Sequence, residues 1–225
     1  MFEKARVLYE TNKVQSYLFR KVLYGGNGIF SDRVFNTEFD KSKSIFIHIP
    51  KVAGRSIAHC LYGNERTGHF YHQDYFNNNK GKVDQYFKFA FVRDPLDRIY
   101  SSYSYLINGG GNPRDMYIGK YIKENTKSFD DFVINWLNDK TKYSWIHFVP
   151  QVDFIYRIDG QGVDFIGKFE NINEDFNLLV EKLGIGSKKL PLRNQNYNKA
   201  KINHSRLTES KVKELYKEDY IRFNY

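Results

Sequence analysis

A lysine and a run of small residues follow the first apolar stretch of this chain. Residues 44–49 read Ser-Ile-Phe-Ile-His-Ile and stop at Pro50, which cannot donate a hydrogen bond to a sheet ladder. Lys51 and Gly54 follow, and residues 56–61 can begin a helix. A strand that leads through a short turn into a helix N-terminus directs backbone N–H groups at one point, where an anion binds. The pattern predicts a phosphate-binding loop; the alternative is a plain strand-to-helix turn.

This loop differs from the P-loop of nucleotide hydrolases. That motif requires a lysine directly after a glycine and directly before the hydroxyl that holds magnesium. Here Lys51 precedes Gly54, and the P-loop pattern occurs nowhere in the chain. A kinase-like nucleotide enzyme therefore remains as an alternative with weaker support.

A second candidate anion site follows another apolar run. Residues 86–92 read Tyr-Phe-Lys-Phe-Ala-Phe-Val and predict a buried strand that ends at Arg93. Asp94 can cap the following helix, and Pro95 suits its first turn. Ser101 lies about two turns into that helix, so its hydroxyl and the Arg93 guanidinium can converge on one anion at the strand's carboxyl end. The alternative is a surface arginine paired with a neighbouring aspartate.

Together these segments resemble the sulfotransferase superfamily, in its carbohydrate branch, which includes heparan sulfate 2-O-sulfotransferase and bacterial relatives. The 5′-phosphosulfate loop of that branch typically reads H-I-P-K-T-A-G-T-S, and residues 48–56 read H-I-P-K-V-A-G-R-S. The 3′-phosphate motif reads approximately F-V-R-[DN]-P-x-[DE]-R-x-x-S, which residues 91–101 match. Residues 148–155 and 163–171 look like the downstream blocks. The resemblance runs from about residue 44 to the C-terminus.

The resemblance implies transfer of a sulfuryl group from 3′-phosphoadenosine 5′-phosphosulfate (PAPS) to a carbohydrate hydroxyl, by in-line attack and with a histidine base. No metal is implied, and the sequence carries no CxxC, HExxH or EF-hand pattern. Lys51 would stabilise charge on the leaving phosphate, which makes it a catalytic candidate as well as a binding one. The implied cofactor-binding residues are Lys51, Val52, Ala53, Gly54, Arg55, Ser56, Ile57, Arg93 and Ser101.

Two loop positions depart from the family pattern. Val52 and Arg55 stand where the family usually has threonines, whose hydroxyls can bond phosphate oxygens. Arg55 either replaces those bonds with charge-assisted ones or points to solvent. These departures leave a third hypothesis open, in which the chain is a nucleotide- or glycan-binding protein without catalytic activity.

The base is expected among the six histidines, because the histidine pKa lies near neutrality. In the 2-O-sulfotransferase branch, a Gly-His pair before the second strand supplies it, and Gly68-His69 resembles that pair. His69 is therefore the candidate base and His72 the second candidate; the alternative is a histidine on a surface loop. Glu65 and Asp74 could serve if their pKa values were raised.

Length and composition set the architecture. The 225 residues suffice for one domain with a full core. We expect an α/β, P-loop-like three-layer fold with a central parallel sheet flanked by helices. Residues 1–43 form an N-terminal helical extension, and residues 44–225 form the core that binds PAPS and the acceptor.

The chain is basic, with 35 Lys and Arg against 26 Asp and Glu, giving a net charge of +9. This balance favours anionic partners such as PAPS and an anionic polysaccharide; a lipid-linked oligosaccharide is a further candidate acceptor. No nucleic-acid-binding motif is present, so we expect no nucleic-acid partner.

Targeting signals also bear on location. Cys60 is the one cysteine, which suits a reducing compartment. No apolar run reaches the length of about eighteen residues that a membrane span needs, and residues 1–40 lack the continuous apolar region of an export signal. We expect a cytoplasmic, bacterial enzyme. Its opening segment packs on the domain or, alternatively, lies on a membrane surface as a basic amphipathic helix.

Local signals predict several further elements. Residues 108–113, rich in glycine, predict a break bordering the acceptor cleft. Ser128 is a candidate helix cap, residues 163–169 predict a strand, and residues 173–183 predict a helix ended by Gly184. The basic residues 191–205 are expected to form a lid, or else a solvated loop. Thr208 is expected to cap a last helix that runs through Tyr220.

Overall fold

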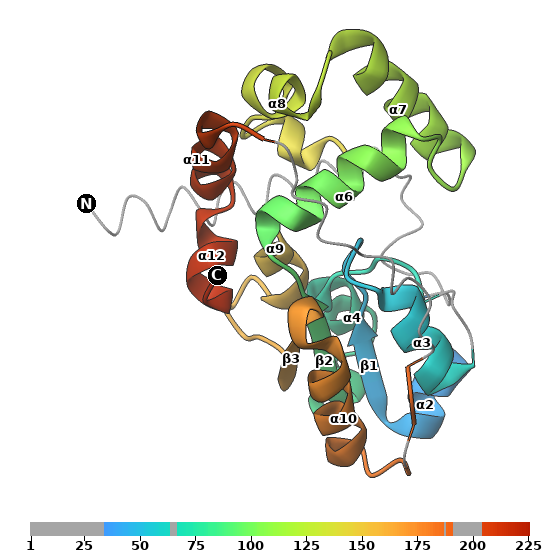
Figure 1. The fold of residues 1–225 in the computed structure, drawn as a ribbon. Coiled ribbons are helices and arrows are strands. Elements are labelled where there is room, and N and C mark those ends of the chain that lie inside the picture. Colours follow the sequence, from blue (N-terminus) through green and yellow to red (C-terminus); the bar gives the residue numbers. More distant parts are fainter. Residues whose placement is uncertain (1–33, 64–66, 187, 191–203) are drawn as a thin grey trace.

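The structure, a computed structural model, describes residues 34–63, 67–186, 188–190 and 204–225. At its centre is a parallel sheet with the strand order β1 (Ser44–Ile47), β2 (Phe87–Val92) and β3 (Phe165–Lys168) (Figure 1). This confirms the expected α/β class with a parallel sheet flanked by helices. Residues 1–33, most of the expected N-terminal extension, and residues 191–203, most of the expected lid, lie outside the described residues.

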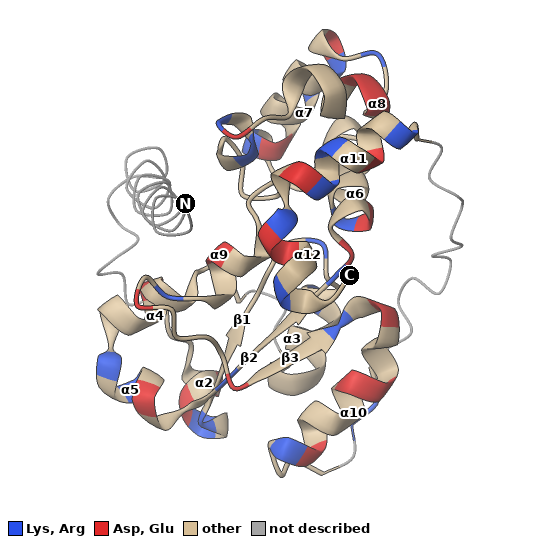
Figure 2. Ribbon diagram, turned by 90° about the vertical axis from the view of Figure 1, so that its left-hand side faces the viewer, with Lys and Arg blue, Asp and Glu red and all other residues tan. Residues whose placement is uncertain are grey.

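The strands form where the sequence is apolar on both faces, as in parallel sheets covered by helices. Phe46 of β1 pairs with Phe89 of β2, and their rings stack with centroids 5.0 Å apart. Phe91 makes an edge contact with Phe165 of β3 at 6.2 Å. In Figure 2, α10 (Ile172–Lys182) and α4 (His72–Asn78) lie on opposite sides of these strands.

The other helices surround the sheet and extend beyond its carboxyl edge. They are α2 (Thr37–Ser42), α3 (Gly54–Tyr62), α5 (Lys80–Gln85), α6 (Pro95–Ile107), α7 (Pro113–Asn125), α8 (Phe129–Asp131), α9 (Gln151–Ile155), α11 (Arg206–Leu215) and α12 (Lys217–Phe223), with a π-helical turn at Phe132–Trp136 and 3₁₀ turns at Thr141–Tyr143 and Phe169–Asn171.

A second apolar core lies above the carboxyl ends of the strands, between α6, α7, α8 and α11 (Figure 1). It includes Ile99, Leu106 and Phe132, all inaccessible to solvent. Helix α7 approaches α6 closely at Gly119, where a Cβ would lie 1.9 Å from the carbonyl oxygen of Leu106. This contact packs the middle of α7 against the last turn of α6.

Most expected caps are present. Asp94 Oδ1 accepts a hydrogen bond from the Asp97 amide at 3.0 Å, which begins α6 at Pro95 as predicted. Ser128 caps α8 as predicted, although the helix continues as a π-helical turn rather than an α-helix. Gly184 follows α10 with a φ of 63°, as expected at a helix end.

The prediction for the last helix was wrong in two respects. Ser205, not Thr208, is the N-cap, because its Oγ accepts from the Thr208 amide at 3.1 Å. The helix also ends at Leu215 and a new one begins at Lys217. The break lies at Tyr216, whose buried hydroxyl donates to the Phe148 carbonyl at 2.7 Å. A tertiary hydrogen bond of this kind leaves no local signal in the sequence.

Candidate active site

The loop between β1 and α3 has the backbone shape of an anion-binding turn. Lys51 and Ala53 adopt left-handed conformations, with φ of 71° and 61°. Such residues turn neighbouring backbone N–H groups toward a common point, and strained conformations of this kind concentrate at functional sites. Ala53 is the N-cap of α3, so the first amides of that helix also begin at the loop.

The imidazole of His48 lies against the backbone of Gly54. A Cβ at Gly54 would lie 2.0 Å from His48 Cδ2, so only glycine fits. His48 is held there by a 2.8 Å hydrogen bond between its Nδ1 and Thr67 Oγ1 and by stacking on Phe46. His48 therefore shapes the loop and lies below it, with 5% of its surface exposed.

Lys51 extends into a pocket of about 380 Å³. Its ammonium nitrogen lies 4.0 Å from the centroid of the Tyr105 ring. Burial and the charge of Arg93 lower the pKa of Lys51 to about 8. The pocket is lined by Lys51, Tyr100, Ser101, Ser104, Tyr105, Asn108 and Gly110. The structure thus brings Lys51 and Ser101 to one cavity, bordered by the glycine-rich break after α6.

Arg93 lies beneath the loop and is 2% exposed. Its Nη1 donates to the carbonyl oxygen of Lys51 at 3.3 Å, and its Nη2 lies 3.8 Å from Asp97 Oδ2. Gln151 bonds both the amide and the carbonyl of Arg93, at 2.9 and 2.8 Å. Arg93 therefore contacts the loop that follows β1, and its side chain is not part of the pocket lining that includes Ser101, the residue with which it was expected to share an anion.

His69 lies beside the loop with a defined tautomer. Its Nδ1 is 2.7 Å from the carbonyl oxygen of His48. Because a carbonyl only accepts, Nδ1 must carry the proton, and in the neutral ring the lone pair is at Nε2. Burial lowers the pKa of His69 below its ordinary value of 6.5, although the His48 carbonyl and Asp115 oppose the shift. The residue as a whole is half-buried. His69 is therefore neutral near pH 7 and can accept a proton.

The other candidate bases that the structure describes make hydrogen bonds away from the loop. His72 is fully buried, and its Nδ1 is 3.0 Å from the carbonyl oxygen of Ile155 at the end of α9. Burial lowers the pKa of His72 to about 4. Asp74 accepts a hydrogen bond from the Tyr71 amide at 2.8 Å and so caps α4. Glu65 lies outside the described residues.

The remaining residues of the loop differ in how far their side chains are buried. Val52 and Ile57 point into the core and are inaccessible, so only their backbone groups can meet a ligand at the loop. The Arg55 side chain is exposed, whereas Ser56 is half-buried at the start of α3.

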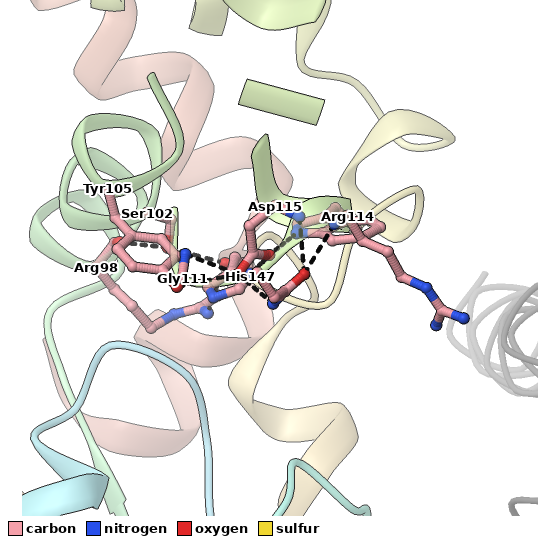
Figure 3. Close-up of polar contacts among 9 residues, drawn as sticks. Arg98, Ser102, Tyr105, Gly111, Arg114, Asp115 and His147 are labelled. Carbon is pink, nitrogen blue, oxygen red and sulfur yellow. Dashed lines mark hydrogen bonds and ion pairs between the residues drawn. The ribbon is translucent and has the colours of Figure 1, made fainter. Parts of the chain in front are cut away.

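A buried carboxylate that sequence reasoning missed lies next to Tyr105, one of the residues that line this pocket. Figure 3 shows its contacts. Asp115 of α7 is 2% exposed, and it accepts hydrogen bonds from the Tyr105 hydroxyl at 2.9 Å and from Trp145 Nε1 at 3.1 Å. His147 Nδ1 lies 3.8 Å from Asp115. Asn112 and Pro113 are the only local signal, since together they mark the start of the helix that carries Asp115.

Arg98, a residue of the second phosphate motif, positions the segment that carries His147. Arg98 is fully buried and donates to the carbonyl oxygens of His147 and Val149, at 3.1 and 2.7 Å. The Ser102 hydroxyl donates to the same His147 carbonyl at 3.0 Å. The arginine that follows Arg93 in the motif therefore holds residues 147–149 against α6.

Comparison with known proteins agrees with this geometry. A family model described as Sulfotransferase family matches residues 37–225, most of the chain. The chain belongs to the sulfotransferase family. Membership supports a sulfotransferase activity in general and implies PAPS as the sulfuryl donor. The sulfotransferase chain is also similar to an uncharacterized protein of Archaeoglobus fulgidus, with 31% identity over 111 residues that cover 48% of this chain and 78% of that protein. No solved structure matches it significantly.

Membrane-spanning helices and metal sites are the two remaining features of this sulfotransferase to consider. No helix among them is long and apolar enough to cross a membrane. Within the same residues, no group of three or more His, Cys, Asp or Glu side chains is placed to hold a metal ion.

Proposed function

We propose that this sulfotransferase moves a sulfuryl group from PAPS to a hydroxyl of a carbohydrate, with His69 as the base. One observation carries the proposal. His69 is neutral, has its lone pair at Nε2 and lies against the loop that bears Lys51. A proton acceptor thus lies beside a cationic, anion-binding turn, as transfer between a hydroxyl and a phosphosulfate requires.

The residues of the site suit a donor with two phosphate groups. The left-handed turn at Lys51 and Ala53 leads into the first amides of α3, and the Lys51 side chain lines the adjacent pocket. We assign the 5′-phosphosulfate to the backbone of residues 51–57 and to Lys51. The residue Ser101 lines the same pocket, whereas Arg93 is buried beneath the loop, so its guanidinium must become accessible when the donor binds. We assign the 3′-phosphate to these two residues.

In the proposed step, one side chain takes up the proton of the acceptor and another stabilises the charge on the leaving phosphate. The donor supplies a sulfuryl group bound to a good leaving group, the 5′-phosphate. As the acceptor oxygen bonds to sulfur, its proton passes to Nε2 of His69. The bond between sulfur and the bridging oxygen breaks, and negative charge grows on the phosphate that leaves. The Lys51 ammonium, charged below a pH of about 8, lies where it can stabilise that charge.

The acceptor is proposed from charge rather than from a described pocket. The net charge of +9 favours an anionic polysaccharide, and a lipid-linked oligosaccharide held near a membrane surface is a second candidate. A cytoplasmic, bacterial location is the setting in which we expect this acceptor to be met.

Two other functions make different predictions. A kinase-like enzyme would bind ATP with magnesium, and a non-catalytic protein would bind nucleotide without transferring sulfate. Incubation with radiolabelled PAPS and a panel of anionic polysaccharides, without metal, tests the proposal. Label on a polysaccharide is the expected result. Nucleotide binding without transfer to any acceptor in a broad panel would favour the non-catalytic alternative.

A further inference from the structure

The ring of Tyr105 lies between the ammonium group of Lys51 and the carboxylate of Asp115. The Lys51 nitrogen is 4.0 Å from the ring centroid, and the Tyr105 hydroxyl donates to Asp115 Oδ2 at 2.9 Å. A cation over the face of an aromatic ring is attracted by the ring's quadrupole. Tyr105 thus contacts the cation with its face and the anion with its hydroxyl.

Asp115 holds this arrangement rigidly because its two oxygens are engaged from several directions. Oδ2 also accepts from Asn112 Nδ2 at 2.6 Å and from the Gly111 amide at 3.4 Å, while Oδ1 accepts from Trp145 Nε1 at 3.1 Å. A buried carboxylate that accepts hydrogen bonds from several donors is fixed in orientation. The Tyr105 hydroxyl is therefore held at the outer end of the side chain (Figure 3), and the ring packs against His147 with centroids 5.2 Å apart.

We propose that Tyr105, held by Asp115, is a positioning residue that keeps the ammonium of Lys51 charged and directed into the pocket. The part that concerns donor binding rests on the proposed function. The part that concerns the charge and placement of Lys51 stands on the contacts alone.

Lys51 needs such support because its surroundings oppose its charge. Partial burial removes water from the ammonium, and the nearby Arg93 guanidinium repels it, whereas Asp115 attracts it. The groups that face Lys51 from the elements packed around it are Tyr105 of α6, Asp115 of α7, Arg93 after β2, and His69 and His147 of the neighbouring loops. Asp115 is the one group among these whose charge favours the ammonium.

The first experiment measures the charge of Lys51 without any nucleotide. Acetylation of Lys51 by acetic anhydride, followed across pH by mass spectrometry, reports its pKa, because only the neutral amine reacts. Asp115→Asn should lower the pKa of Lys51 and speed acetylation several-fold at pH 7. Glu124→Gln removes a carboxylate from the exposed end of the same helix and should leave the profile unchanged. An identical profile in Asp115→Asn would overturn the proposal.

The second experiment is a double-mutant cycle on binding of 3′-phosphoadenosine 5′-phosphate (PAP), measured by calorimetry. Tyr105→Leu should weaken binding about tenfold, within the range of a partly desolvated cation–π contact. Tyr105→Phe keeps the ring and should reduce PAP affinity by a smaller factor. In a Lys51→Met background, Tyr105→Leu should have little further effect, because a positioning residue acts through the lysine. Tyr117→Leu, at an exposed tyrosine of α7, is the control.

The outcomes separate the two proposals. Failure of the unaltered protein to bind PAP would overturn the proposed function, and the acetylation profile would still decide the role of Asp115. Suppose instead that the unaltered protein binds PAP normally and that Tyr105→Leu reduces PAP affinity equally in the unaltered protein and in the Lys51→Met variant. That result would overturn the positioning role and leave the proposed function intact. If Asp115→Asn does not fold, the Tyr105 cycle decides.

Discussion

Among single residues, the proposed chemistry depends most on His69, which must be neutral, and on Lys51, which must be charged. His69→Ala should reduce turnover by a factor of about 10² to 10⁴, the usual contribution of a general base, and leave PAP affinity nearly unchanged. Steady-state sulfate transfer and calorimetry measure the two quantities. The matched control is His59→Ala, at an exposed histidine of α3. Full turnover in His69→Ala would place the base elsewhere.

The same two groups predict a bell-shaped dependence of kcat/KM on pH. The pKa of His69 is lowered, so activity should rise with pH through a value below 6.5, where the ring loses its proton. The pKa of Lys51 is about 8, so activity should fall above that pH as the ammonium becomes neutral. Lys51→Arg should abolish the upper limb, since arginine stays charged. An upper limb that persists near pH 8 in that variant would assign it to another group.

At the scale of elements, the turn between β1 and α3 depends on the absence of a side chain at Gly54. Gly54→Ala should displace the His48 ring, because the new Cβ would lie 2.0 Å from Cδ2. We expect at least a tenfold loss of PAP affinity, measured by calorimetry. Gly81→Ala in α5 is the control, since its Cβ would meet nothing closer than 3.5 Å. Unaltered affinity in Gly54→Ala would show that this contact does not shape the site.

Elements marked by local signals were predictable from the sequence. The apolar runs gave β1 and β2 nearly to the residue, and the Asp94-Pro95 pair marked the start of α6, because strand periodicity and capping act within a few residues. The break at Tyr216 was not predictable. It depends on a hydrogen bond to Phe148, a residue distant in sequence.

At the scale of the whole molecule, buried histidines should make the fold sensitive to acid. The pKa of His72 falls to about 4 in the folded state, below the 6.5 of the unfolded chain. The unfolded state therefore binds more protons between these values. As the pH is lowered through this range, His72 should reduce the free energy of unfolding by up to about 1.4 kcal/mol per pH unit. Asp219, whose pKa burial raises to about 6, has the opposite effect over pH 6 to 4.

Thermal denaturation between pH 7 and pH 5 tests this expectation. The midpoint should fall with pH, because the pKa values of His48, His69 and His147 are lowered by burial as well. The His72→Gln variant should show a shallower fall than the unaltered protein. A midpoint independent of pH would contradict the account of these side chains as buried and neutral.

The site as a whole was only partly predictable. Lys51, Ser101 and His69 stood out because each belongs to a short motif. The group formed by Tyr105, Asp115 and His147 did not, because it joins α6, α7 and the segment before α9, and only tertiary packing brings these together. The burial of Arg93 beneath the loop was equally invisible, since the spacing places the residue without orienting its side chain.

The most direct test of the proposed function is calorimetric titration with PAP, beside ATP with magnesium. PAP carries both of the phosphate groups that we assign to this site, and ATP lacks the 3′-phosphate. We predict tight binding of PAP without metal and little binding of ATP. Tight binding of ATP with magnesium and none of PAP would contradict it and favour a kinase-like enzyme.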